Sequence, residues 1–333
     1  MDTIDSSPVS NQMSRRAVLI GGAALGAAGA AGLVTSGQPA AAQALIPQGA
    51  PKARVGATFD LFPFKKGTTW NQAVDEWNAR TRTQMRCWKV YYQDSKFPTS
   101  IPAGSQLRTI INRRIQALVC FRPAIVKPGN KAHVNADFAH MEAALKLFLR
   151  SGLDAEICLY QEVGPRDMTA AQYHATVRHY GPMIRHYYPL TWNAPGYLHP
   201  DVWTTYDPGQ DQLDGYALDL YGGEFTNKGY NLEPLIKLAG DKPVGVWEIG
   251  NTDSDTFFPS KTQLVAYMDY LRKTLAKREA QKLPVGSVAW YMGPADAKQH
   301  GQNEIVGTHP NPLAGEDVKK YRELYSAVNQ VTS

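Results

Sequence analysis

Two short stretches of the sequence are the most informative, because each has the composition of an apolar strand and ends in a glutamate. The first reads ICLYQEVG over residues 157–164, and the second reads PVGVWEIG over residues 243–250. Both have β-type composition, and a glycine follows Glu162 and Glu248 within two residues. A carboxylate at the end of a buried strand costs free energy unless another group pairs with it or uses it. These two glutamates are therefore the first candidates for a functional site.

Outward from these stretches, β-type runs alternate with amphipathic runs along the chain. Strands that alternate with helices predict parallel pairing, and about eight such units close into a barrel, whereas six would favour an open doubly wound sheet. We therefore predict a single (β/α)8 TIM barrel over residues 54–333. The expected strands are 55–60, 86–92, 117–122, 155–162, 190–194, 216–221, 244–249 and 285–292. The expected helices are 70–83, 107–115, 138–148, 169–187, 232–238, 264–275 and 317–328.

The barrel prediction brings the two glutamates together. Strands four and seven lie across the mouth of an eight-stranded barrel from each other, and the loops after the strands gather at that mouth. Alternation of side chains along a strand predicts that Glu162 shares a face with Tyr160 and Cys158, and that Glu248 shares a face with Val246. Two carboxylates placed in this way could flank one glycosidic bond.

The N-terminus is expected to lie outside the barrel. Arg15 and Arg16 precede an uncharged run rich in glycine and alanine, which inserts into lipid less readily than a spanning helix does. Ala42-Gln43-Ala44 fits a small-x-small cleavage site. We interpret residues 1–44 as a twin-arginine export signal and residues 45–53 as a linker. The alternative is an uncleaved anchor; otherwise no stable membrane span is expected, and the protein is predicted to be secreted or extracytoplasmic.

Composition limits the function classes. The chain has 333 residues, 43% of them hydrophobic and 20% charged, which excludes a mostly disordered chain. The formal net charge of +5 comes without a long basic run, so nucleic-acid binding is not expected. The histidines do not have metal-ligand spacing, and no cofactor or metal is expected. We expect a monomer, with Cys87, Cys120 and Cys158 as buried free thiols.

The short motifs around the two glutamates resemble those of a known group of enzymes. Tyr160-Gln161-Glu162 and the residues WEIG over 247–250 resemble the clan A glycoside hydrolases, which are eight-stranded barrels. The resemblance implies that Glu162 is the proton donor and Glu248 the nucleophile. Asn most often precedes the proton donor in the clan, whereas this chain has Gln161; the mannanase-like family 26 tolerates such a change. The resemblance further implies that Tyr221 donates to Glu248 and that Trp290 forms the floor of the sugar subsite.

Other polar or aromatic residues stand at the expected strand ends. Arg122 could bridge to a glutamate at the rim, position Glu162 or contact substrate. Asp60, Asp219 and Asn193 could line the cleft, or could instead cap loops and pair with buried bases. Tyr92 belongs to the aromatic residues near the expected loops, where rings can stack on the C–H faces of sugars.

The predicted function is hydrolysis of glycosidic bonds in a polysaccharide or oligosaccharide, with two carboxyl groups as the only chemical machinery. Retention of configuration follows from the resemblance, since a sequence gives no distance between the carboxyl groups. The alternative is a carbohydrate-binding barrel without turnover, and a third possibility is a barrel lyase or esterase. Mannan, glucan and arabinan remain open as substrates, as do endo and exo action.

Overall fold

A computed structural model describes residues 54–59, 67–92, 95–220, 225, 229–249 and 261–292, and within these it does not describe the side chains of residues 58–59, 80, 261–265 and 290–292. All of them belong to one compact unit, Ala42–Ser333. The predicted export signal, the linker and the predicted helix over 317–328 lie outside the described residues, as do Asp60 and Tyr221.

Eight parallel strands form the sheet. They pair in the order β4-β3-β2-β1-β8-β7-β6-β5. Ile157 in β4 also forms a parallel bridge with Leu190, next to β5, which joins the two ends of this order into a ring. The predicted (β/α)8 TIM barrel is confirmed. The strands are β1 (Val55–Phe59), β2 (Cys87–Tyr92), β3 (Gln116–Phe121), β4 (Ala155–Leu159), β5 (Thr191–Pro195), β6 (Gly215–Asp219), β7 (Val244–Ile249) and β8 (Val285–Met292).

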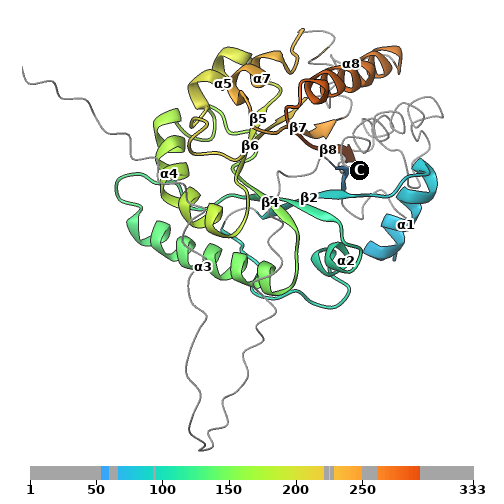
Figure 1. The fold of residues 1–333 in the computed structure, drawn as a ribbon. Coiled ribbons are helices and arrows are strands. Elements are labelled where there is room, and N and C mark those ends of the chain that lie inside the picture. The colour runs from blue at the N-terminus through green and yellow to red at the C-terminus, as the bar shows by residue number, and fades with distance from the viewer. Residues whose placement is uncertain are drawn as a thin grey trace, which may run out of the picture. The chain divides into compact units, whose positions relative to one another are not determined.

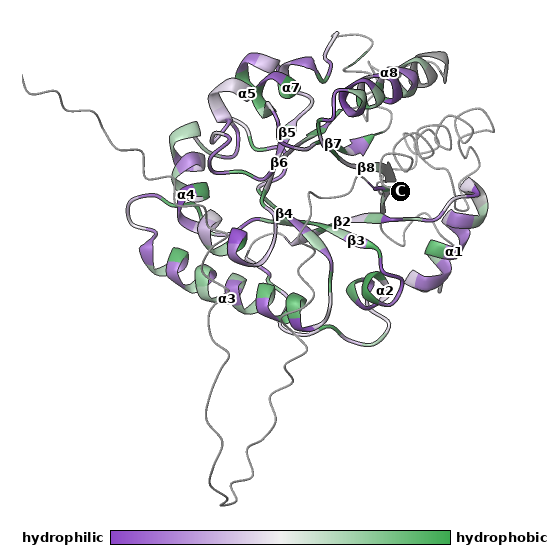
Figure 2. Cartoon of the chain, viewed as in Figure 1, coloured by the Kyte–Doolittle hydropathy of each residue, from purple (hydrophilic) through white to green (hydrophobic). Residues whose placement is uncertain are grey.

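Helices surround the strands (Figure 1). Thr69 and Thr169 begin α1 and α4 with reciprocal capping boxes, each with a glutamine three residues later. Figure 2 shows hydrophilic and hydrophobic residues alternating along the helices, as expected where one side packs on the sheet. None of the helices that the structure describes has both the length and the apolar composition of a membrane-spanning segment. The helices are α1 (Trp70–Thr81), α2 (Gln106–Asn112), α3 (Lys131–Arg150), α4 (Ala170–Tyr187), α5 (Pro200–Tyr206), α7 (Glu233–Ala239) and α8 (Lys261–Ala280).

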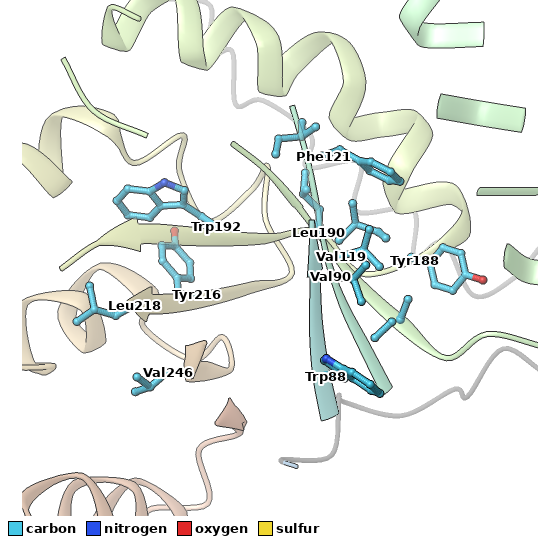
Figure 3. Close-up of a cluster of buried hydrophobic side chains, with 14 of the residues drawn as sticks. Trp88, Val90, Val119, Phe121, Tyr188, Leu190, Trp192, Tyr216, Leu218 and Val246 are labelled. Carbon is cyan, nitrogen blue, oxygen red and sulfur yellow. The ribbon is translucent and has the colours of Figure 1, made fainter. Parts of the chain in front are cut away.

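The buried apolar side chains divide between the two faces of the sheet. One cluster mixes strand and helix residues and therefore lies between the sheet and the helices; Trp88, Val119, Phe121 and Val246 belong to it (Figure 3). A smaller cluster contains strand residues alone and fills the interior of the barrel. The members of the interior cluster are Cys87, Leu118, Cys120, Cys158, Ala217, Trp247 and Ala289.

The three cysteines are buried free thiols, as predicted. Cys120 and Cys158 are paired neighbours on β3 and β4. Burial raises the pKa of Cys87 and of Cys120 above the usual range, so both thiols stay protonated at neutral pH. The cysteines therefore act as small apolar residues of the barrel interior.

The predicted strand ends were partly wrong. Strands β7 and β8 have the predicted bounds, but β4 ends at Leu159 instead of residue 162, and β6 ends at Asp219 instead of residue 221. Tyr160 and Glu162 both adopt left-handed backbone conformations, with φ of 56° and 52°. Because a left-handed residue cannot continue a strand, the chain turns at Tyr160.

A buried polar layer lies near the amino-terminal ends of the strands. The amide of Gln116 donates to Glu156 Oε1 at 3.2 Å, and the Thr191 hydroxyl donates to Glu156 Oε2 at 3.2 Å. The Ser287 hydroxyl donates to Gln116 Oε1 at 2.8 Å. Residues at this end of a barrel usually stabilise the fold and do not take part in catalysis. Burial raises the pKa of Glu156 to about 7, in spite of the two hydrogen bonds.

Glu156→Gln is expected to make the protein less sensitive to alkaline pH. Because the folded pKa of Glu156 is raised to about 7, the folded state binds its proton more tightly than the unfolded state does. The stability that this proton provides is complete below about pH 4.3, the usual pKa of a glutamate, and is lost as pH rises through 7. A shift of this size corresponds to roughly 3–4 kcal/mol. Urea unfolding at pH 5 and pH 8 measures the effect, with the exposed Glu76→Gln as control; an equal gap between variant and wild type at both pH values contradicts it.

Candidate active site

A cluster of ion-paired side chains lies inside the barrel, as the interior cluster of apolar side chains does. Lys89 Nζ donates to Asp219 Oδ2 and to Glu248 Oε1, each at 2.8 Å. The side chains of Lys89 and Asp219 are fully buried, and that of Glu248 is 5% exposed. Burial opposes the charge on Lys89, but the two carboxylates outweigh it and hold the pKa of the lysine well above its usual range. Lys89 is therefore a permanent cation between two acids.

Two further side chains complete the cluster. The hydroxyl of Tyr91 donates to Glu248 Oε1, and the amide of Asn193 donates to Asp219 Oδ2 at 2.8 Å. Burial and then the charge of Glu248 raise the pKa of Tyr91 well above its usual range, so the phenol keeps its proton and remains a donor. The cluster joins strands β2, β5, β6 and β7 across the barrel, and each acid in it has at least two donors.

A β-bulge turns Glu248 into the barrel. Val246 packs in the cluster between the sheet and the helices, called the outer cluster below. Trp247 packs in the interior cluster, as the alternation of side chains along a strand requires. The pairing register then shifts between Val246 and Ile249, and Glu248 contacts Lys89 inside the barrel. The prediction that Glu248 shares a face with Val246 was wrong, because the bulge allows two consecutive residues to face inward.

Glu162 reaches the site from a turn instead of a strand. Its backbone N–H donates to Asn193 O at 3.1 Å, which fixes the turn to β5. Tyr160 is directed the other way: its hydroxyl donates to Pro123 O and its ring packs in the outer cluster. The predicted common face of Glu162, Tyr160 and Cys158 was therefore wrong, because the left-handed conformations at positions 160 and 162 break the alternation.

The three acids influence one another electrostatically. Burial, followed by the negative charges of Asp219 and Glu248, raises the pKa of Glu162 well above its usual range. The positive charges of Lys89 and Arg122 act in the opposite direction and are outweighed. Burial and the charge of Glu248 also raise the pKa of Asp219, to about 7. The arrangement therefore favours the protonated form of Glu162 and an ion-paired Glu248, a division of roles that acid–base catalysis requires.

The remaining predicted residues are spread around this cluster. Asn193 and Asp219 belong to it, as described above. Arg122 follows β3 and is half-buried, with its Nη1 4.0 Å from Asp167 Oδ1. Gln161 is half-buried in the turn before Glu162.

Two aromatic predictions have different outcomes. Tyr92 packs on Phe121 and on Phe148 of α3, with ring centroids 5.7 and 6.4 Å apart, so its ring lies on the helix side of the sheet and away from the cluster. Trp290 lies in β8, where its backbone pairs with Ala57 and Ile249, and its side chain is outside the described part of the structure.

Lys89 and Tyr91 belong to the cluster but were not predicted from the sequence. Lys89 stands in the strand CWKVYY between the buried residues Trp88 and Val90. A lysine is almost never fully buried without a partner, so a charge inside this apolar strand was the available signal. Alternation then places Tyr91 on the same face as Lys89, and Tyr92 on the opposite one.

Metal binding finds no support in this cluster. Within the described ranges, no group of three His, Cys, Asp or Glu side chains is arranged to hold a metal ion. The candidate site consists of acids, a lysine, a phenol and an amide, which are groups that transfer protons, form esters and bind hydroxyls.

An eight-stranded barrel with one glutamate after strand four and another near the end of strand seven is the architecture expected of clan A glycoside hydrolases, and comparison with solved structures finds the same fold there. The catalytic domain of an endo-β-1,4-mannanase of family GH26 from Bacillus sp. JAMB-750 superposes with a TM-score of 0.54 at 12% identity, covering 83% of this chain and 86% of that chain. A GH26 β-mannanase from Bacteroides ovatus gives a TM-score of 0.53 at 12% identity, covering 82% and 88%.

The comparisons by sequence find no relative. No family model matches the chain, and no curated protein matches it. The expected resemblance to clan A barrels, in the neighbourhood of family 26, is thus confirmed as a likeness of fold. A shared fold does not determine activity or substrate, which depend on the residues of the site.

Proposed function

We propose that this protein is a glycoside hydrolase in which Glu162 is the general acid/base and Glu248 the nucleophile. The observation that carries the proposal is the unequal environment of the two acids. Lys89 and Tyr91 both donate to Glu248. Glu162 has its pKa raised by burial and by the nearby charges of Asp219 and Glu248. One carboxylate stabilised by donors and one carboxylic acid that keeps its proton are the two reagents of glycoside hydrolysis.

The first chemical step forms a glycosyl ester. A carboxylate oxygen of Glu248 attacks the anomeric carbon, and the bond from that carbon to the leaving oxygen breaks with its electron pair. Glu162 gives its proton to the leaving oxygen, so the departing sugar leaves as a neutral alcohol. Glu162 is then an anion, and the loss of negative charge from Glu248 on ester formation makes that anion easier to accommodate.

The second step hydrolyses the ester. A water molecule attacks the anomeric carbon while Glu162 takes up one of its protons, and the bond to Glu248 breaks. Glu248 regains its negative charge, which the ammonium of Lys89 and the hydroxyl of Tyr91 stabilise by hydrogen bonds. Two displacements give retention of configuration, which here is inherited from the resemblance to clan A.

The polysaccharide to test first is mannan. The two neighbours in fold are, by their descriptions, β-mannanases. Gln161 precedes the acid where the clan most often has asparagine, which changes how the sugar 2-hydroxyl is held.

Residues 1–44 are proposed as a twin-arginine export signal. A host with that pathway should secrete the full chain, and Arg15→Lys together with Arg16→Lys should abolish secretion.

The test of the proposed function begins with a panel of mannans, glucans and arabinans and continues with Glu162→Gln on the substrate that is cleaved. Replacing the acid is expected to lower kcat/KM roughly 100- to 10,000-fold for natural glycans, whose leaving groups need a proton. Dinitrophenyl glycosides need no proton, so their first step should be almost unaffected. In wild type, activity should fall as pH rises past the raised pKa of Glu162, and the variant should lose this alkaline limb.

Two outcomes contradict the assignment. Equal losses for natural and activated substrates would remove the acid role from Glu162. Binding of glycans without any turnover by the wild type would favour the alternative, a carbohydrate-binding barrel in which the glutamates only bond to hydroxyls.

A further inference from the structure

Three consecutive strand ends place side chains around Glu162. Arg122 follows β3, Glu162 follows β4, and Tyr197 follows β5. Strand β3 pairs with β4, and Ile157 of β4 bridges to the start of β5, so the three ends are neighbours. The hydroxyl of Tyr197 donates to Glu162 O at 3.4 Å. These residues are on the side of the barrel mouth that belongs to the proposed acid, across from Glu248 on β7.

Arg122 has donors that none of the described residues uses. Its Nε is buried, and among the described residues it has no hydrogen-bond partner. The Asp167 carboxylate is 4.0 Å from Nη1, beyond hydrogen-bond distance, and its Oδ2 accepts from Gly164 N at 3.0 Å. The Arg122 side chain is 31% exposed, so a ligand can reach it. A guanidinium has five donors in a planar fork, which matches the two oxygens of a carboxylate.

The neighbours of Arg122 add a ring and a second cation. Tyr197 is 37% exposed, more than any other large hydrophobic side chain among the described residues. Arg166 is exposed in the loop between β4 and α4. An exposed ring can stack on the C–H face of a sugar, and the guanidinium groups can bind an acidic substituent on it. The net charge of +5 also favours the approach of an anionic glycan.

We propose that Arg122 and Tyr197 form a subsite for a hexuronic acid residue on the leaving-group side of Glu162, with the sugar carboxylate on the guanidinium of Arg122 and the sugar ring against Tyr197. The proposal rests on the proposed function, because the position of the leaving group follows from the acid role of Glu162. The substrate class that we infer is a glycan that contains carboxylated sugars. The cluster of acids, lysine and phenol around Glu248 would not by itself distinguish such a glycan from a neutral one.

A merely structural role for Arg122 would give a different pattern. Its charge lowers the pKa of Glu162 against the larger effect of burial, so removing it could alter catalysis on every substrate alike. A subsite for uronic acids instead discriminates between substrates with and without the carboxylate. The test therefore compares binding of matched sugars by a protein that does not turn them over.

Binding is measured by calorimetry with the Glu248→Gln variant, with Glu162→Gln as a second inactive background if the first unfolds. The probes are trisaccharides of mannuronic, glucuronic and galacturonic acid, each paired with the neutral trisaccharide of mannose, glucose or galactose. At least one uronate is expected to bind about tenfold more tightly than its neutral partner, because charge-assisted hydrogen bonds are roughly twice as strong as neutral ones. Added Arg122→Gln should remove this preference, Arg122→Lys should keep part of it, and Arg178→Gln, an exposed arginine on α4, should leave it unchanged.

The outcomes separate this inference from the proposed function. Neutral trisaccharides that bind as well as every uronate, with or without Arg122, overturn the subsite and leave the hydrolase proposal standing. A preference for a uronate that survives Arg122→Gln also overturns the assignment to Arg122. If no trisaccharide of either kind binds, the subsite fails, whereas the proposed function is judged separately by the hydrolysis of the polysaccharide panel.

Discussion

Glu248→Ala is expected to lower hydrolysis about 100,000-fold, and sodium azide is expected to restore part of the activity. Removing a catalytic nucleophile costs losses of this order in well-studied hydrolases. The truncation leaves a space next to Lys89 Nζ and the Tyr91 hydroxyl, both of which donate to Glu248 Oε1 in the wild type. A small anion would be held there by the same two donors.

Azide in that space attacks the anomeric carbon from the side that Glu248 uses. The product is a glycosyl azide of inverted configuration, formed while Glu162 protonates the leaving oxygen. NMR of the product identifies it. Glu248→Gln is the matched control, since its amide fills the space and leaves no room for azide. A wild-type product of inverted configuration, together with no azide product from the alanine variant, would remove Glu248 from the nucleophile role.

The sequence predicts the barrel well because the barrel depends on patterns that repeat. Apolar strands such as β7 and β8 end where composition changes, and their predicted bounds agree with the structure. Capping residues such as Thr169 mark the start of a helix by local chemistry. Parallel pairing then follows from the alternation of strands and helices. None of these inferences depends on the direction of a single side chain.

Side-chain direction at the site could not be predicted in the same way. Simple alternation would turn Glu248 toward the helices, with Val246, and the bulge in β7 reverses this. Tyr160 and Glu162 adopt positive φ values although neither is a glycine, a conformation that side chains normally disfavour. Local deviations of this kind concentrate at functional sites, where the surrounding structure holds them in place. The two glutamates were found by residue type and position, while their geometry came from exceptions to the pattern.

The network around Asp219 shows why the partners of a buried polar side chain cannot be predicted from the sequence alone. Lys89, Asn193 and Asp219 come from three strands, and their pairing depends on which layer of the barrel each side chain occupies. The spacing of 130 residues between Lys89 and Asp219 carries no local signal. What the sequence does contain is the cost of each polar residue in an apolar strand, which indicates that a partner exists without identifying it.

Lys89→Met is expected to lower both stability and activity, because it leaves two buried acids without their common cation. Removing one partner of a buried ion pair costs about 3–5 kcal/mol, since the remaining charge has no compensation. In the variant, Asp219 and Glu248 face each other without the ammonium between them. Glu248 also loses the donor that stabilises its anion each time the glycosyl ester is hydrolysed, so kcat should fall. Urea unfolding and kcat on the cleaved glycan measure the two effects.

The double variant Lys89→Met with Asp219→Asn separates charge balance from catalysis. Neutralising Asp219 removes the uncompensated charge next to Glu248, so the double variant should regain part of the stability that Lys89→Met loses. It should not regain full activity, because Glu248 still lacks the ammonium that stabilises its anion in each cycle. Equal losses of stability in the single and double variants would mean that Lys89 contributes through packing. An unchanged kcat in Lys89→Met would mean that the ammonium has no part in holding Glu248 ready as the nucleophile.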